Sequence, residues 1–123
     1  MMFLAKLWKT TILEILRLTE KNLTFQIGFT LDKECGALYS KKDGMVRLLI
    51  NPENFDFKQP PDKRFWNIFV RALEEVAHAV AQDEDYCSGH NETYNKHKNN
   101  LLEKILPQLS WRTVWKQAQT ATL

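Results

Sequence analysis

The sequence contains few cysteines and histidines, and its charge is nearly balanced. Its two cysteines, Cys35 and Cys87, exclude a four-cysteine zinc site and a disulfide-dense scaffold. Its three histidines, His78, His90 and His97, allow at most one ordinary histidine-rich metal site. The formal net charge is only +2, from 17 basic and 15 acidic residues, so no large positive field favours nucleic-acid binding. Motifs typical of nucleotide-binding loops and of serine hydrolases are absent as well.

The sequence also lacks a long apolar run. No window approaches about 18 uncharged apolar residues, so we expect no membrane-spanning helix and no membrane partner. Lys6 and Lys9 interrupt the apolar N-terminus, and no small-residue cleavage site follows a long apolar stretch, so we expect no signal peptide. We therefore predict a cytoplasmic, intracellular protein in which both cysteines are reduced.

What the sequence does contain is typical of one globular domain. The chain has 123 residues, of which 44% are hydrophobic, and a chain of this length buries roughly two thirds of its unfolded surface. We therefore expect a single domain over residues 1–123. Residues 3–20 are predicted to form its first helix, because apolar residues recur on one broad face: Leu4, Leu7, Trp8, Ile12, Ile15 and Leu16.

Three strands are predicted after this helix. Residues 23–31 alternate strictly between apolar and polar side chains, which is typical of a half-buried strand. A shorter strand over 37–40 and a third over 45–50 flank Asp43-Gly44, a dipeptide that favours a tight hairpin turn. The apolar run of the third strand predicts that both of its faces are covered. In chain order these strands predict a three-stranded antiparallel meander.

Helices are predicted again in the C-terminal half. Asp62 is a candidate N-cap for a long helix that ends at about Gln82. A further helix is expected over residues 91–106, and a last short helix over 110–118. The overall expectation is an α+β domain.

The long helix carries the pattern Glu74-Glu75-Val76-Ala77-His78. Residues four apart share a helix face, so Glu74 and His78 can converge on one ligand. Glu75 lies about 100° around the helix and can still reach that ligand. His90 follows just before the next helix, and a helical pair of ligands plus one later histidine is a common arrangement in three-ligand zinc sites.

These residues resemble the zincin metallopeptidases, in particular the SprT-like and minimal gluzincin-type domains. Those domains carry H-E-x-x-H on a helix, followed by Gly-His and then Phe or Tyr. Here the corresponding residues are 74–78 and the stretch from Gly89-His90 to Tyr94. The predicted order of helix, meander and motif helix is similar too, so the resemblance covers roughly residues 3–105 and implies a zincin-like fold.

The resemblance also implies roles, with one departure from the family pattern. His78 and His90 match zinc ligands, Glu75 matches the general base, and Glu74 replaces the first ligand histidine. In one interpretation Glu74, His78 and His90 bind zinc, and Glu75 activates a zinc-bound water for peptide hydrolysis. In the other, the metal site is lost, no cofactor is bound, and the domain binds a protein or peptide. We favour the second interpretation, a degenerate metallopeptidase-like domain.

Two surfaces are candidates for partner binding. Trp111 and Trp115 are four residues apart on the last predicted helix, and tryptophan is enriched at interfaces. They could anchor a partner or a second copy of the chain, or they could instead pack on the first helix near Trp8. The sheet edge beside the motif helix is the other candidate, because in related zincins an extended peptide adds a strand there. His97 is interpreted as an exposed or partly covered helix residue.

Overall fold

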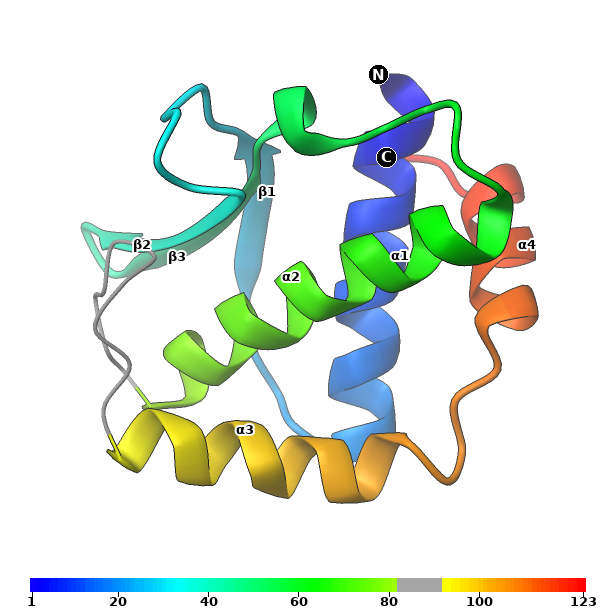
Figure 1. Ribbon diagram of the computed structural model, residues 1–123. Helices are drawn as coiled ribbons and strands as arrows, with labels where there is room; N and C mark the ends of the chain where they lie inside the picture. The colour runs from blue at the N-terminus through cyan, green and yellow to red at the C-terminus, as the bar shows by residue number, and fades with distance from the viewer. Residues whose placement is uncertain (82–91) are drawn as a thin grey trace.

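The structure is a computed structural model, and it describes residues 1–81 and 92–123. These residues form four α-helices and one three-stranded sheet (Figure 1), which confirms the α+β class. The first helix, α1, runs through the middle of the molecule between the sheet and the last helix, α4 (Figure 1). Among the described helices, none combines the length and apolar composition required to cross a bilayer.

Helix α1 spans Met2–Thr19 and buries the apolar face predicted from its sequence. Its largest side chain, Trp8, is fully buried, and the indole N–H donates a hydrogen bond of 2.8 Å to the carbonyl oxygen of Leu48. This bond fixes α1 to the central strand of the sheet. The helix ends at Glu20, which adopts the left-handed conformation with φ 55° and ψ 37°. The next amide, of Lys21, donates to the carbonyl of Leu16, which closes a Schellman-type cap.

The sheet consists of β1 (Phe25–Phe29), β2 (Ala37–Lys42) and β3 (Met45–Ile50), in the spatial order β1-β3-β2. Strands β2 and β3 form the expected antiparallel hairpin through a two-residue turn. Strand β1, however, pairs in parallel with β3 and does not pair with β2. The prediction of a three-stranded antiparallel meander is therefore wrong, and the sheet is mixed.

The connection between β1 and β2 explains this order. Asn51, at the end of β3, is buried, and its side-chain amide donates to the carbonyl oxygens of Asp32 and Cys35, at 3.0 Å in each case. Its backbone N–H donates to the carbonyl of Gly36. These bonds hold the segment between the first two strands across the end of β3. The chain thus passes the position of β3 before β2 begins, and β3 later inserts between the two.

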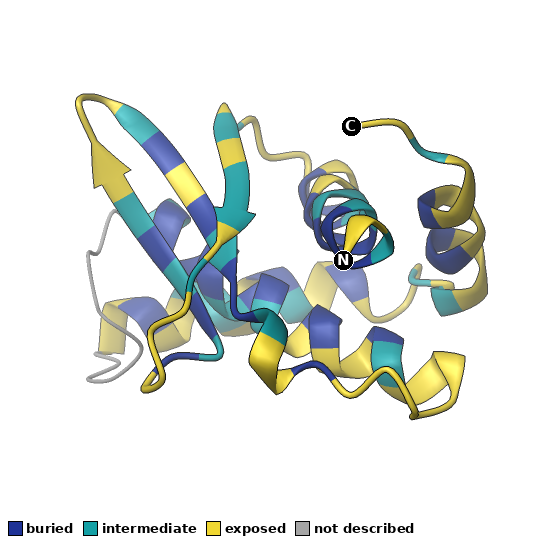
Figure 2. Cartoon of the chain, turned by 90° about the horizontal axis from the view of Figure 1, so that it is seen from above, coloured by how far each residue is buried: buried dark blue, intermediate teal, exposed yellow. Residues whose placement is uncertain are grey.

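Strand β3 is central, but it is not covered on both faces as its apolar run predicts. Val46, Leu48 and Ile50 are buried, whereas Arg47 is exposed. The sheet therefore has one face packed on the helices and one face open to solvent (Figure 2). Such a pattern is usual where strands pair without helices on both sides.

The remaining helices pack against α1 and the inner face of the sheet. A short 3-10 turn, η1 (Pro52–Asn54), leads to α2 (Pro61–Ala81). Pro61 is the first residue of α2, so Asp62 lies in the first turn and is not the N-cap. Helix α2 crosses the molecule and contacts β2 and β3, α3 (Glu92–Ile105) packs against α2 and α1, and α4 (Trp111–Thr120) packs against α1 and α2.

Candidate functional site

The motif helix brings Glu75 and His78 to the buried side of α2. Glu75 is 3% exposed and His78 is 0% exposed. Both residues lie on the side of α2 that faces the core, because residues three apart are neighbours on a helix. Glu74 is only half-buried, at the edge of the same turn. The structure therefore brings the proposed base and the second proposed ligand into the core and leaves Glu74 at the core's margin.

Two tyrosine rings lie beside the imidazole of His78. Tyr94 of α3 stacks on it with the ring centroids 4.3 Å apart and the planes inclined at 29°. Tyr39 of β2 lies nearly parallel to it, with centroids 6.4 Å apart and planes inclined at 15°. Both tyrosines are buried. We refer to Glu75, His78, Tyr39 and Tyr94 as the His78 cluster; it joins α2, α3 and β2.

Sequence reasoning found part of this cluster and missed Tyr39. Tyr94 was the aromatic residue that follows the Gly-His pair in the resemblance. Tyr39 has a weaker signal: it alternates with Leu38 and Ser40, and this period of two places it with Ala37 on the buried face of β2. Because a strand pattern gives a face and no partner, it does not predict that Tyr39 contacts His78.

The described residues contain only part of the predicted metal site. In residues 1–81 and 92–123, no three His, Cys, Asp or Glu side chains are grouped so that they could hold one. Of the predicted zinc ligands, Glu74 and His78 are described, and His90 lies outside the described residues. Two of the three predicted ligands are thus placed by the structure, and they differ in burial.

Among residues 1–81 and 92–123, strand β2 forms one edge of the sheet, beside the His78 cluster. It is hydrogen-bonded to β3 on one side, and it packs against α2. Its turn has positive φ at Asp43 (53°) and Gly44 (79°), as expected for a type I′ hairpin. In such a hairpin the residues next to the turn, Lys42 and Met45, form a hydrogen-bonded pair. The amide of Lys41 therefore faces away from β3.

The tryptophan pair is packed against the rest of the domain. Trp115 is buried and meets Phe3 of α1 edge-to-face, with ring centroids 4.9 Å apart. The guanidinium of Arg64 covers the Trp115 ring at 4.8 Å from its centroid. Trp111 is half-buried against the core, with its ring centroid 6.4 Å from that of Phe65. Trp115 thus packs on α1, which is the alternative that the sequence left open beside partner binding.

The structure differs from the sequence-based expectation for Cys35. This residue is buried and disulfide-bonded, so the prediction of a reduced Cys35 is wrong. The only other cysteine in the sequence, Cys87, lies outside the described residues. Disulfides persist in oxidising environments and are rare in reducing ones. The bond therefore weighs against the cytoplasmic location predicted from the sequence.

In comparisons with protein-family models, curated proteins and solved structures, nothing matches this chain. The resemblance to zincins therefore rests on residues 74–78, on the Gly-His pair with its following tyrosine, and on the order of the elements.

Proposed function

We propose that the chain is a degenerate metallopeptidase-like domain that binds a protein or peptide at the edge of its sheet. The observation that carries this proposal is the packing of His78. A residue at the position of a zinc ligand is fully buried, and its ring lies against those of Tyr39 and Tyr94. Its present role in the structure is to join α2 to β2 and α3. A catalytic zinc site, by contrast, must keep one coordination position open to water and substrate.

The edge of β2 supplies the binding surface in this proposal. An extended peptide adds to a sheet edge through main-chain hydrogen bonds, and side-chain pockets then provide selectivity. The ladder of β2 with β3 leaves alternate main-chain groups facing outward, among them the amide of Lys41. Lys41 and Lys42 are exposed at the end of this strand. Their charges favour a peptide with acidic residues at the corresponding positions.

The experiment is selection of peptides from a random display library on the purified full chain, followed by affinity measurement for the enriched sequences. We expect extended peptides that contain acidic residues. Lys41→Pro removes the outward amide without removing a hydrogen bond to β3, and it should abolish binding. Lys41→Gln is the matched control, because it removes the same charge and keeps the amide; it should weaken binding only a few-fold.

Two results would overturn strand addition at β2. One is equal binding by Lys41→Pro and the wild type, with both melting at similar temperatures. The other is failure to enrich any peptide in repeated selections on folded protein.

The alternative function is zinc-dependent peptide hydrolysis, and one observation favours it. Glu75 and His78 are buried on the same side of α2 at the spacing of base and ligand in the zincin motif. Elemental analysis of the purified protein separates the two functions. Zinc bound near one equivalent, lost in Glu74→Gln and retained in Glu75→Gln with loss of peptidase activity, would replace the binding proposal with this one.

A variant that restores the usual motif tests the geometry of these positions. Glu74→His rebuilds the first ligand histidine, so it should strengthen zinc binding if residue 74, His78 and His90 converge. Unchanged zinc affinity in this variant would show that they do not converge. Glu74 is a better position for this test than His78, because it is half-buried and its replacement disturbs the core less.

A further inference from the structure

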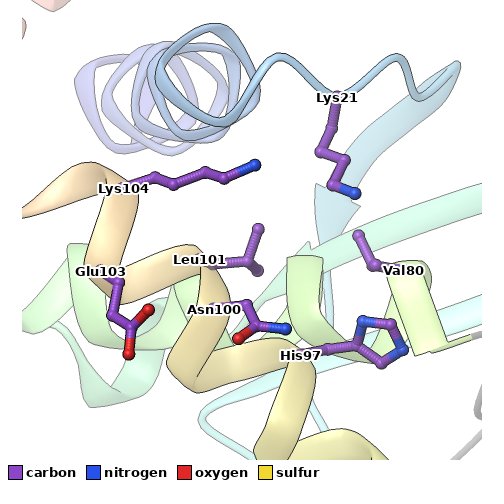
Figure 3. A pocket seen from close by; sticks show the side chains of 7 residues that line it. All are labelled: Lys21, Val80, His97, Asn100, Leu101, Glu103 and Lys104. Atoms are coloured by element: carbon purple, nitrogen blue, oxygen red, sulfur yellow. The ribbon is translucent and has the colours of Figure 1, made fainter.

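A pocket lies between the C-terminal end of α2, helix α3 and the residues that follow α1 (Figure 3). Its volume is about 270 Å³. It is lined by none of the residues of the His78 cluster or the β2 edge. Its lining combines two lysines, a histidine and an asparagine with two apolar side chains. The composition suggests a ligand that is anionic at one end.

The sequence builds this pocket from three parts of the chain: Lys21 after α1, Val80 of α2, and helix α3. His97, Leu101 and Lys104 recur at intervals of three and four residues, so they lie on one face of α3. Asn100 is next to this face and also lines the pocket. Lys21 comes from the cap of α1, where its backbone amide is held by a hydrogen bond of 3.0 Å to the carbonyl of Leu16. The cap therefore holds the backbone of Lys21 in place, and the side chain extends into the pocket from there.

In the view of Figure 3 the apolar side chains of Leu101 and Val80 lie between the two lysines above and His97 and Asn100 below. Leu101 is buried and Val80 is half-buried, and together they supply an apolar wall. In Figure 3 the side chains of Lys21 and Lys104 extend into the same space, with the His97 ring and the Asn100 amide below them. Each of these four side chains carries at least one hydrogen-bond donor.

The charges of this pocket are incompletely balanced. Glu103 also lines it, but its carboxylate points away from the two ammonium groups in the view of Figure 3. Among residues 1–81 and 92–123, neither Lys21 nor Lys104 forms an ion pair. Two positive charges that face one space repel each other, and an anion placed between them removes this repulsion and gains charge-assisted hydrogen bonds.

We propose that this pocket binds the phosphate group of a small phosphate monoester. The ammonium groups of Lys21 and Lys104 extend into one space from two separate elements, and each carries several N–H donors, which suits the several oxygens of a tetrahedral phosphate better than the two oxygens of a planar carboxylate. The apolar wall of Leu101 and Val80 then contacts the organic part of the ligand. The volume is slightly below the range of about 300–1,000 Å³ for drug-sized ligands, so the ligand is small. The inference is independent of the peptide-binding proposal.

The test is titration of the full chain with inorganic phosphate, glycerol 3-phosphate and acetate at matched ionic strength, followed by amide chemical shifts. We expect saturable shifts of α3 and of residues near Lys21 with both phosphates, with a dissociation constant of about 1 mM or lower for the monoester. Lys21→Gln and Lys104→Gln should each weaken binding about tenfold, because each removes a charge-assisted hydrogen bond. Lys116→Gln, an exposed lysine on α4, is the matched control and should bind normally.

Three outcomes would overturn the proposal. Acetate that binds as tightly as phosphate would indicate a carboxylate site. Equal weakening by Lys116→Gln would indicate general attraction of anions to the surface. A monoester that binds more weakly than inorganic phosphate would show that the apolar wall does not receive the organic part of the ligand.

Discussion

The ring of His78 stacks on the ring of Tyr94 with their centroids 4.3 Å apart, and this contact joins the motif helix to α3. Both side chains are fully buried. Aromatic contacts of this kind contribute about 0.5–1.5 kcal/mol beyond the burial of their area. The position that resembles a zinc ligand is therefore also a packing position, and a change there affects both stability and any role in binding.

His78→Ala should lower the free energy of unfolding by about 3 kcal/mol, because it leaves a cavity between Tyr39 and Tyr94 in the core. Urea denaturation followed by circular dichroism measures this loss. His97→Ala is the control, since His97 is only half-buried on α3, and its effect should stay within about 0.5 kcal/mol. Equal effects of the two variants would contradict a core role for His78.

Trp8→Phe should lower the free energy of unfolding by about 2–3 kcal/mol, because it removes the donor to the Leu48 carbonyl and leaves a small cavity. Denaturant titration gives this value. Trp66→Phe makes the same chemical change at a side chain that is 39% exposed, and it should cost no more than about 0.5 kcal/mol. If both variants lose the same stability, the buried hydrogen bond is not what distinguishes Trp8.

The sequence predicted the helices and the strand positions well, and it failed on how the strands pair. The apolar face of α1 and the bounds of β3 follow from local periodicity, which the chain carries in every few residues. The position of β1 beside β3 depends on bonds from Asn51 to Asp32 and Cys35, up to 19 residues away. A period of two gives the face of a strand but does not select its neighbour. An antiparallel meander is the simplest order for three consecutive strands, but these long-range bonds stabilise the order β1-β3-β2 instead.

In the candidate site, too, local spacing predicts some features and long-range contacts determine the others. Glu75 and His78 lie on one helix, so their common buried side follows from spacing alone. The contact of His78 with Tyr39 joins residues that are 39 positions apart, and nothing in either local pattern indicates it. The phosphate pocket likewise joins Lys21 to α3 through the cap at Glu20, which lacks the glycine typical of such caps.

Asn51→Ala should lower the free energy of unfolding by about 2–3 kcal/mol. The side chain donates to two carbonyl oxygens and accepts from the amide of Glu53, and the buried groups left behind lose their partners. Thermal and chemical denaturation both measure the effect. Asn54→Ala, at an exposed position of η1, should change stability by at most about 0.5 kcal/mol. If Asn51→Ala leaves the free energy of unfolding unchanged, other contacts hold the segment between β1 and β2 in place.

Glu20→Gly should raise the free energy of unfolding by about 1 kcal/mol, because glycine adopts the left-handed conformation of this cap without the steric cost that Glu20 bears. The melting temperature should rise by about 4 °C. Glu20→Ala is the matched control: it removes the same carboxylate and keeps a Cβ, so it should give no comparable gain. A glycine variant no more stable than the alanine variant would show that the cap is not strained.

The disulfide at Cys35 predicts that reduction destabilises the protein. A disulfide restricts the unfolded chain, and its removal typically lowers the free energy of unfolding by about 2–4 kcal/mol. We expect a lower melting temperature in the presence of a thiol reductant and no thiol at Cys35 that reacts when the unreduced protein is denatured. Cys35→Ser should lose the same stability and should no longer respond to reductant. A non-reducing gel separates a bond within one chain from a bond between two chains. Full thiol reactivity in the denatured, unreduced protein would instead support the reduced state that the sequence suggests.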